Sequence, residues 1–151
     1  MPETIISDTS CFIILSKIDE LDLLFKLYGK VITTSEVANE FGKTLPEWVE
    51  IKSPVDKSKQ QILQIQIDIG EASAIALALE NPGSTIILDD FKARVIAEKL
   101  GLTITGTIGV IVKSKLRGII PSVKPILNKI RATDFRFSEE VEQQALKQAE
   151  E

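Results

Sequence analysis

The 151-residue chain is long enough for one domain, and its composition, 44% hydrophobic and 26% charged, excludes disordered, fibrous and membrane classes. It contains no histidine, which excludes Ser-His-Asp and Cys-His catalytic systems and histidine-containing zinc sites. The formal net charge of -4 gives no whole-chain indication of nucleic-acid binding.

The sequence carries no signal for a membrane or for secretion. No apolar run approaches the roughly 20 residues that span a bilayer, and the start at Met1 lacks a signal-peptide pattern. The single cysteine, Cys11, cannot form an internal disulfide and lies in an apolar stretch, so we expect it to fill the core. We therefore expect a cytoplasmic protein without a membrane anchor.

Apolar runs of strand length alternate with stretches of helical period, which predicts an α/β fold with a parallel sheet covered by helices on both faces. The elements expected first are a strand at 4–7, a helix from 19–22 to 28, a strand at 30–33, a helix at 35–41, an edge strand at 48–51 and a helix at 56–67. We expect Asp19 to cap the first of these helices and Gly29 to end it.

The second half of the chain continues the alternation. Gly70 is expected to break the chain before an alanine-rich buried helix at 71–79. There follow a strand at 84–88 buried on both faces, a helix from 90 to 100, a strand at 102–105, a helix from 107 to 116, a connector at 118–121 and two more helices. We expect one domain over 1–137, with 138–151 as a charged helix that is part of it or appended to it.

Carboxylates follow two of the expected strands. Asp8 follows the first strand, and the pair Asp89 and Asp90 follows the strand at 84–88. An isolated aspartate in such a place often serves a turn or caps a helix. Because ligands bind beyond the carboxyl ends of strands in open α/β sheets, two strands that end alike predict a divalent-metal site.

Two glutamates are further candidates for this site. Glu71 begins the alanine-rich helix, where it can complement the helix dipole, but so apolar a helix is expected to direct it into a cleft. Thr33 to Glu36 fits a capping box, which accounts for Glu36 and leaves Glu40 as the better candidate in the same helix.

Several short motifs occur together, in order, over roughly the first 117 residues. They are Asp8-Thr9-Ser10, SEVANEF at 35–41, GEASAIALA at 70–78, LDDFKAR at 88–94 and TGTIGV at 105–110. This pattern resembles the PIN domain family, in particular its small prokaryotic members with GEA and TGTxGV motifs. The resemblance implies a three-layer sandwich with a parallel sheet in the order 3-2-1-4-5, and a ribonuclease dependent on Mg²⁺ or Mn²⁺.

The resemblance also implies roles for individual residues. The catalytic set carried over by position is Asp8, Glu40, Glu71, Asp89 and Asp90, of which Asp8, Glu71, Asp89 and Asp90 are the expected metal ligands. Either member of the Asp89-Asp90 pair can be the ligand, with the other capping the helix. Ser10 and Thr107 match small hydroxyl residues that support the carboxylates, and each also fits a turn. Oxygen ligands alone suit Mg²⁺ or Mn²⁺.

A basic stretch offers a surface for an RNA substrate. Residues 101–136 hold seven basic residues and one acidic residue, and Lys92 and Arg94 lie nearer the carboxylates. Phosphate contacts are expected there, although a solvated helical surface accounts for the stretch equally well. Aromatic residues are few, so base stacking is not expected to dominate. In the family such proteins are often toxins paired with an antitoxin, and often homodimers.

Three alternatives were weighed. A phosphatase of the haloacid dehalogenase class needs D-x-D after the first strand, but Ser10 occupies the second acidic position. A Rossmann dehydrogenase needs G-x-G-x-x-G, which does not follow the first strand. The remaining alternative is a PIN-like module that binds nucleic acid or a protein with little or no turnover.

Overall fold

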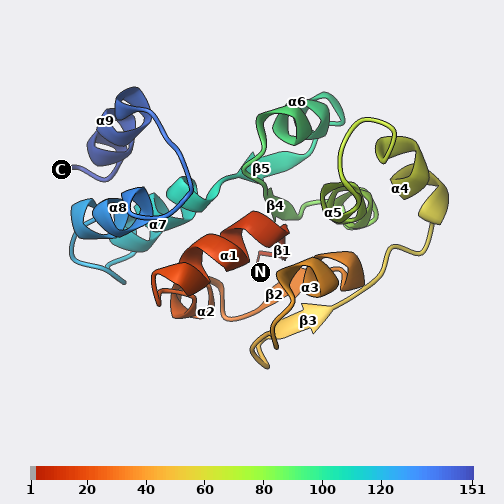
Figure 1. The fold of residues 1–151 in the computed structure, drawn as a ribbon, viewed down its shortest axis with the longest axis horizontal. Coiled ribbons are helices and arrows are strands. Elements are labelled where there is room, and N and C mark those ends of the chain that lie inside the picture. The colour runs from red at the N-terminus through yellow and green to blue at the C-terminus, as the bar shows by residue number, and fades with distance from the viewer. Residues whose placement is uncertain (1–2) are drawn as a thin grey trace.

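A five-stranded parallel sheet forms the centre of the computed structural model, which describes residues 3–151 (Figure 1). Its strands are β1 (Ile5–Ser7), β2 (Val31–Thr33), β3 (Val49–Ile51), β4 (Thr85–Ile87) and β5 (Thr103–Thr105). They lie in the order β3-β2-β1-β4-β5, and every neighbouring pair is parallel. The order 3-2-1-4-5 is therefore confirmed, with β3 at the edge as expected.

Helices cover both faces of this sheet. They are α1 (Thr9–Lys17), α2 (Asp22–Tyr28), α3 (Ser35–Phe41), α4 (Lys57–Leu63), α5 (Ile69–Leu79), α6 (Phe91–Lys99), α7 (Thr107–Leu116), α8 (Lys124–Arg131) and α9 (Glu139–Gln148). In Figure 1, α1, α2 and α7 to α9 lie to one side of the strands, and α4, α5 and α6 lie to the other. The predicted three-layer architecture is confirmed.

Each central strand is buried on both faces, which explains its nearly continuous apolar sequence. On β1, Ile5 packs into the core beneath α1, α2 and α7, whereas Ile6 packs into the core beneath α5 and α6. On β4, Ile87 and Ile86 divide in the same way. Cys11 is 1% exposed in the first core, which confirms it as core filler.

The first helix of the structure was missed by the sequence analysis. The chain leaves β1 at Ser7 and enters α1 directly, because Asp8 is already at the N-cap position. Asp19 does not cap the next helix, as we had expected, but has a positive φ of 56° in the turn between α1 and α2. Leu21 is the N-cap of α2, and Gly29, with φ 76°, ends it as predicted.

The predicted capping box from Thr33 to Glu36 is wrong. The N-cap of α3 is Thr34, whose hydroxyl accepts a hydrogen bond from the Val37 N–H at 3.1 Å. Thr33 is the last residue of β2, and its hydroxyl donates to the Ser7 carbonyl at 2.7 Å. The N-cap lies one residue later than predicted, and because Val37 then occupies the third helical position, no capping box forms.

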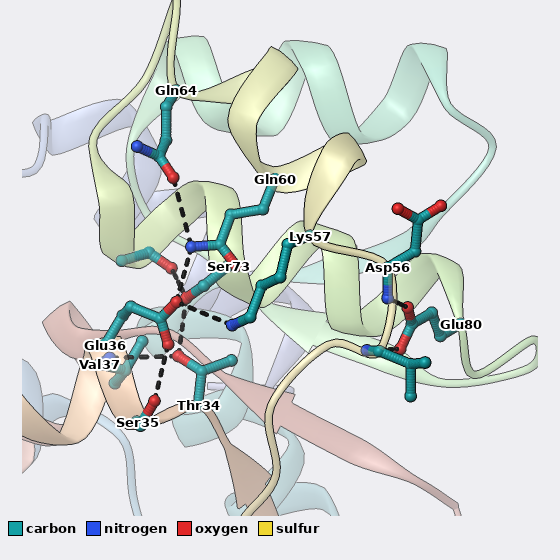
Figure 2. A network of polar contacts seen from close by, with 12 residues as sticks. Thr34, Ser35, Glu36, Val37, Asp56, Lys57, Gln60, Gln64, Ser73 and Glu80 are labelled. Carbon is teal, nitrogen blue, oxygen red and sulfur yellow. Dashed lines mark hydrogen bonds and ion pairs between the residues drawn. The ribbon is translucent and has the colours of Figure 1, made fainter.

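Glu36 instead belongs to a polar network between α3 and α4 (Figure 2). Its Oε2 accepts a hydrogen bond from Gln60 Nε2 at 2.6 Å and lies 3.4 Å from Lys57 Nζ. In the same view, the buried hydroxyls of Thr34 and Ser73 lie 2.7 Å apart and tie α3 to α5. The two helices that carry Glu40 and Glu71 are thus fixed against each other.

A capping box does occur at the start of α5, where the sequence analysis expected a break at Gly70. Asp68 Oδ1 accepts from the Glu71 N–H at 2.9 Å, and Glu71 Oε1 accepts from the Asp68 N–H at 3.4 Å. Gly70 therefore lies inside the first turn, and α4 ends at Leu63 rather than at residue 67. The expected burial of the alanine-rich helix is confirmed, since residues 72–78 are all buried.

The C-terminal helix packs on the body of the protein. Ala145 and Ala149 are buried in the same core as α7. The Glu142 carboxylate lies 3.1 Å from Lys124 Nζ and 3.0 Å from Arg131 Nη2, both on α8. A boundary after residue 137 stays a prediction. No helix in the part of the chain that the structure describes is long and apolar enough to cross a membrane.

Candidate active site

Asp8 lies at the carboxyl end of β1, in the middle of the sheet. Its N–H donates to the Ile87 carbonyl on β4 at 3.1 Å, and the residue is 3% exposed. Its Oδ1 is buried and has no hydrogen-bond partner among residues 3–151. Burial, with smaller contributions from the charges of Asp68, Glu40 and Asp89, raises the pKa of Asp8 to about 7.

Glu71 approaches the same point from the first turn of α5. It is partly buried, and its backbone N–H and carboxylate both take part in the capping box with Asp68. Burial raises the pKa of Glu71 to about 8, with contributions from the charges of Asp68, Asp8 and Asp90. The structure therefore brings Glu71 close enough to Asp8 and Asp90 for their charges to affect its pKa.

The aspartates of the Asp89-Asp90 pair have different surroundings. Asp89 accepts a hydrogen bond from the Thr107 N–H at 2.9 Å and from the Thr107 hydroxyl at 2.6 Å. Burial raises the pKa of Asp89, against the opposing effect of these bonds and of the nearby Arg94 charge. Asp90 is exposed and caps α6 by accepting from the Ala93 N–H at 3.0 Å. Asp90 is the helix cap, and Asp89 is the partly buried carboxylate held by Thr107.

Glu40 reaches this cluster across a glycine. The Thr9 hydroxyl donates a hydrogen bond to Glu40 Oε1. A Cβ on Gly70 would lie 2.8 Å from Glu40 Oε1 and 3.4 Å from Thr9 Oγ1, so the missing side chain makes room for this approach. The capping-box argument for Glu40 over Glu36 was wrong. The contacts still separate the two glutamates. Glu36 accepts a hydrogen bond from Gln60, whereas the charge of Glu40 contributes to the raised pKa of Asp8.

The backbone around the cluster is electropositive. Helices α1, α5, α6 and α7 begin at the N-cap residues Asp8, Asp68, Asp90 and Gly106. Helix N-termini carry a partial positive charge, which offsets part of the repulsion between the carboxylates. A cation also acts on the cluster: Arg94 donates from Nη1 to the Leu88 carbonyl at 2.7 Å, and its charge opposes the rise in the pKa of Asp89.

The residues fit a hard divalent cation in their chemistry. The donors are all oxygens, and the buried Asp8 Oδ1 is an acceptor without a donor, which costs free energy unless a cation or donor reaches it. Within residues 3–151, no group of three or more His, Cys, Asp and Glu side chains is arranged to hold a metal ion as it stands. The carboxylates are close enough to affect one another's pKa, but their side chains would have to move closer to ligate one metal ion.

Two of the expected supporting residues lie outside this set of contacts. Ser10 is partly buried on α1, and its hydroxyl forms no side-chain hydrogen bond with the described residues. Lys92 is exposed on α6 and forms no ion pair within residues 3–151. Thr107 and Arg94, by contrast, both contact the chain segment at Asp89.

The basic stretch is largely neutralised by ion pairs. Lys113 pairs with Glu3 at 3.1 Å, Lys115 with Glu151 at 3.8 Å, Lys124 and Arg131 with Glu142 at 3.1 and 3.0 Å, and Lys129 with Glu20 at 3.9 Å. Arg117 and Arg136 are the members of the stretch without an ion pair in the described chain. Much of the charge therefore holds the C-terminal helices in place.

A groove of about 650 Å³ opens beside Asp89. Its walls come from α6, from the start of α7 and from the segment before α9, so they are far apart in sequence. The lining includes Arg94, Arg136, Phe91, Phe135 and Phe137. The two arginines belong to the basic residues that we expected to contact phosphates, whereas nothing in the sequence indicates that the three phenylalanines come together.

Sequence reasoning also missed Asp68 and Gly106. Asp68 raises the pKa of both Asp8 and Glu71, and the D-x-x-E pattern with Glu71 was a detectable capping signal. A Cβ on Gly106 would lie 2.9 Å from Asp89 Oδ1 and 2.9 Å from Arg94 Nη1. Nothing in the sequence alone shows that the side chains of Asp89 and Arg94 come together beside Gly106.

Comparison with known proteins identifies the family. No curated protein matches the chain. The sequence profile of one family, described as the PIN domain, matches residues 4–151. PIN domains are generally nucleases, and this separates the chain from phosphatases of the haloacid dehalogenase class. Because the match covers nearly the whole chain and the sheet has the expected order, the chain belongs to the PIN domain family.

Proposed function

We propose that this PIN domain is a ribonuclease that uses Mg²⁺ or Mn²⁺ to hydrolyse phosphodiester bonds of single-stranded RNA in the cytoplasm. Asp8, Glu40, Glu71, Asp89 and Asp90 form the catalytic set, and Asp8, Glu71, Asp89 and Asp90 are the metal ligands. Asp90 can serve as a ligand through Oδ1, because the helix cap uses only its Oδ2.

One observation carries the proposal. The Asp8 carboxylate is buried at the centre of the sheet, its Oδ1 has no hydrogen-bond partner among the described residues, and other carboxylates raise its pKa. Such an arrangement is costly for the folded protein unless a cation compensates it. Because PIN domains are generally nucleases that use divalent metals, a bound cation is the compensation we propose for this carboxylate.

The chain's own residues orient the reaction. Thr107 donates to both oxygens of Asp89, so this carboxylate keeps one orientation. Glu40 is held by the Thr9 hydroxyl against Gly70. A bound divalent ion lowers the pKa of its water and stabilises charge on the phosphoryl oxygens. Arg94, beside Asp89, is placed to attract the substrate phosphate.

The test is cleavage of a labelled single-stranded RNA by purified wild-type protein with Mn²⁺, Mg²⁺ or EDTA, next to Asp8→Asn prepared identically. We expect cleavage only with metal and a loss of at least 100-fold in rate for Asp8→Asn. Asp134→Asn, an exposed aspartate with a side chain 97% accessible, is the matched control and should cleave at the wild-type rate. Equal rates for wild type and Asp8→Asn would show that a contaminant cleaves the RNA.

A binding module with little or no turnover is the second candidate. One observation favours it: no metal-holding group is preformed in the described chain. It predicts RNA binding that survives Asp8→Asn, with no cleavage by either protein at any metal concentration. The same experiment therefore separates the two candidates.

The biological setting we propose is a toxin paired with an antitoxin protein, with the toxin acting as a homodimer. Induced expression of the wild type should then arrest growth, and Asp8→Asn should not. Sedimentation of the purified chain measures the dimer independently. Normal growth during expression of soluble wild-type protein, without any antitoxin present, would contradict the toxin role.

A further inference from the structure

The groove beside Asp89 has an aromatic wall, which is unusual in a chain with only six phenylalanines. Phe91, Phe135 and Phe137 all line it. Phe91 is 80% exposed, although it lies in the first turn of α6 next to the helix cap Asp90. Exposing so large an apolar ring to water is unfavourable, so the ring is available to a ligand.

The other two rings of the aromatic wall are held by contacts with each other and with α8. The Phe135 and Phe137 rings have centroids 6.2 Å apart, with their planes inclined at 35°. The Arg131 guanidinium lies 4.3 Å above the Phe137 ring centroid, and Arg131 is itself paired with Glu142. These contacts fix the segment before α9 against α8, so this side of the groove does not need to order when a ligand binds.

Positive charge accompanies the rings. Arg136 lines the groove, is exposed and forms no ion pair within residues 3–151, and its Nη1 donates only to the nearby Thr133 carbonyl at 3.0 Å. Arg94 also lines the groove, beside Asp89. Flat apolar rings and two guanidinium groups in one groove match a ligand that is itself planar and aromatic and carries phosphates.

We propose that this groove binds a nucleobase of single-stranded nucleic acid next to the phosphate at the carboxylate cluster. Phe91 stacks on the base, Phe135 and Phe137 supply further apolar wall, and Arg136 contacts a neighbouring phosphate. The volume of about 650 Å³ lies within the roughly 300–1,000 Å³ typical of small-ligand sites. The inference rests on the proposed ribonuclease function, and it reverses the expectation that base stacking plays little part.

Binding to two matched probes tests it. The full-length chain carrying Asp8→Asn, which suppresses cleavage, is titrated by fluorescence anisotropy with a labelled single-stranded RNA octamer. The second probe is an octamer with the same ribose-phosphate backbone but without bases. Base-aromatic stacking predicts that Phe91→Ala weakens binding of the normal octamer roughly 5- to 150-fold. Binding of the abasic octamer should change less than about twofold, because its phosphates are unaltered.

Two further variants separate stacking from charge and from stability. Arg136→Ala should weaken both probes by a similar factor and reduce the salt dependence of binding. Phe25→Ala, on a phenylalanine that is 48% exposed on α2 and outside the groove, should alter neither probe. An equal loss of both probes in Phe91→Ala, or no loss of the normal octamer, overturns the inference.

The outcome is independent of the ribonuclease assay. If wild type does not cleave RNA but Phe91→Ala selectively loses the base-bearing probe, the proposed function fails and the base-binding groove stands. If cleavage depends on Asp8 while Phe91→Ala binds both probes as before, the function stands and the groove inference fails.

Discussion

Replacing Asp8 by asparagine should stabilise the metal-free protein, by an amount that grows with pH. Asp8 has a folded-state pKa of about 7, against about 3.9 for an unperturbed aspartate, because it is buried among other carboxylates. Between these two values the folded state binds more protons than the unfolded state, so stability falls as pH rises from about 4 to 7. Asparagine has the same shape without this titration.

The size of the effect follows from the same numbers. At 1.36 kcal/mol per pKa unit, the ionised Asp8 side chain costs the folded state about 4 kcal/mol at pH 8 and about 1.5 kcal/mol at pH 5. The stability of Asp8→Asn relative to wild type should therefore increase by about 2.5 kcal/mol between pH 5 and pH 8. Taking the difference between two proteins at each pH cancels most of the contribution of their other titrating groups.

Urea unfolding in EDTA, followed by circular dichroism at pH 5, 6.5 and 8, measures this difference. The exposed Asp134→Asn serves as the control and should show a pH-dependent change of less than about 0.5 kcal/mol. Adding Mg²⁺ or Mn²⁺ at pH 8 should stabilise wild type and not Asp8→Asn, since the cation replaces the missing compensation. A constant difference between Asp8→Asn and wild type at all three pH values would refute the reasoning.

Three other substitutions test the surroundings of the cluster. Gly106→Ala places a Cβ 2.9 Å from Asp89 Oδ1 and Arg94 Nη1, so we expect kcat/KM to fall at least tenfold, with the melting temperature reporting the change in stability. Thr107→Ala removes the 2.6 Å hydrogen bond to Asp89, which should raise the pKa of Asp89 and move the acid limb of the pH-rate profile to higher pH; Thr107→Ser should restore it. Thr34→Ala removes a helix cap and a buried hydroxyl contact, and should lower the unfolding free energy by about 2 kcal/mol without changing the pH-rate profile. Unaltered activity in Gly106→Ala, or an unmoved profile in Thr107→Ala, would contradict the site geometry.

The central strands were predictable because each is a short apolar run that is visible in the sequence by itself. The apolar runs that became β1 and β4 end in Asp8 and Asp89, and the carboxyl ends of parallel strands meet at one edge of the sheet. The strand order itself came from the resemblance to PIN domains. Helix α1 was missed because its apolar residues follow β1 without a turn, so the sequence shows no boundary beyond Asp8.

The errors around the site arose from tertiary contacts. The pattern Thr33 to Glu36 satisfies the capping rule, but Gln60, distant in sequence, binds Glu36 instead. The exposed Phe91 and the segment at 135–138 are more than 40 residues apart, and only the packing of α9 brings them to one groove. No pattern within a single helix or strand reports such an arrangement.

Direct location of the metal tests the central claim, that these carboxylates form a divalent-metal centre. Crystals of the full chain grown with Mn²⁺ would show the ion by its anomalous scattering. We predict a peak within about 2.5 Å of Asp8 Oδ1, with Glu71, Asp89 or Asp90 completing the ligands, and no peak there in Asp8→Asn. Millimolar Mn²⁺ that leaves the Asp8 carboxylate without a bound ion, in protein that still cleaves RNA, would contradict the account.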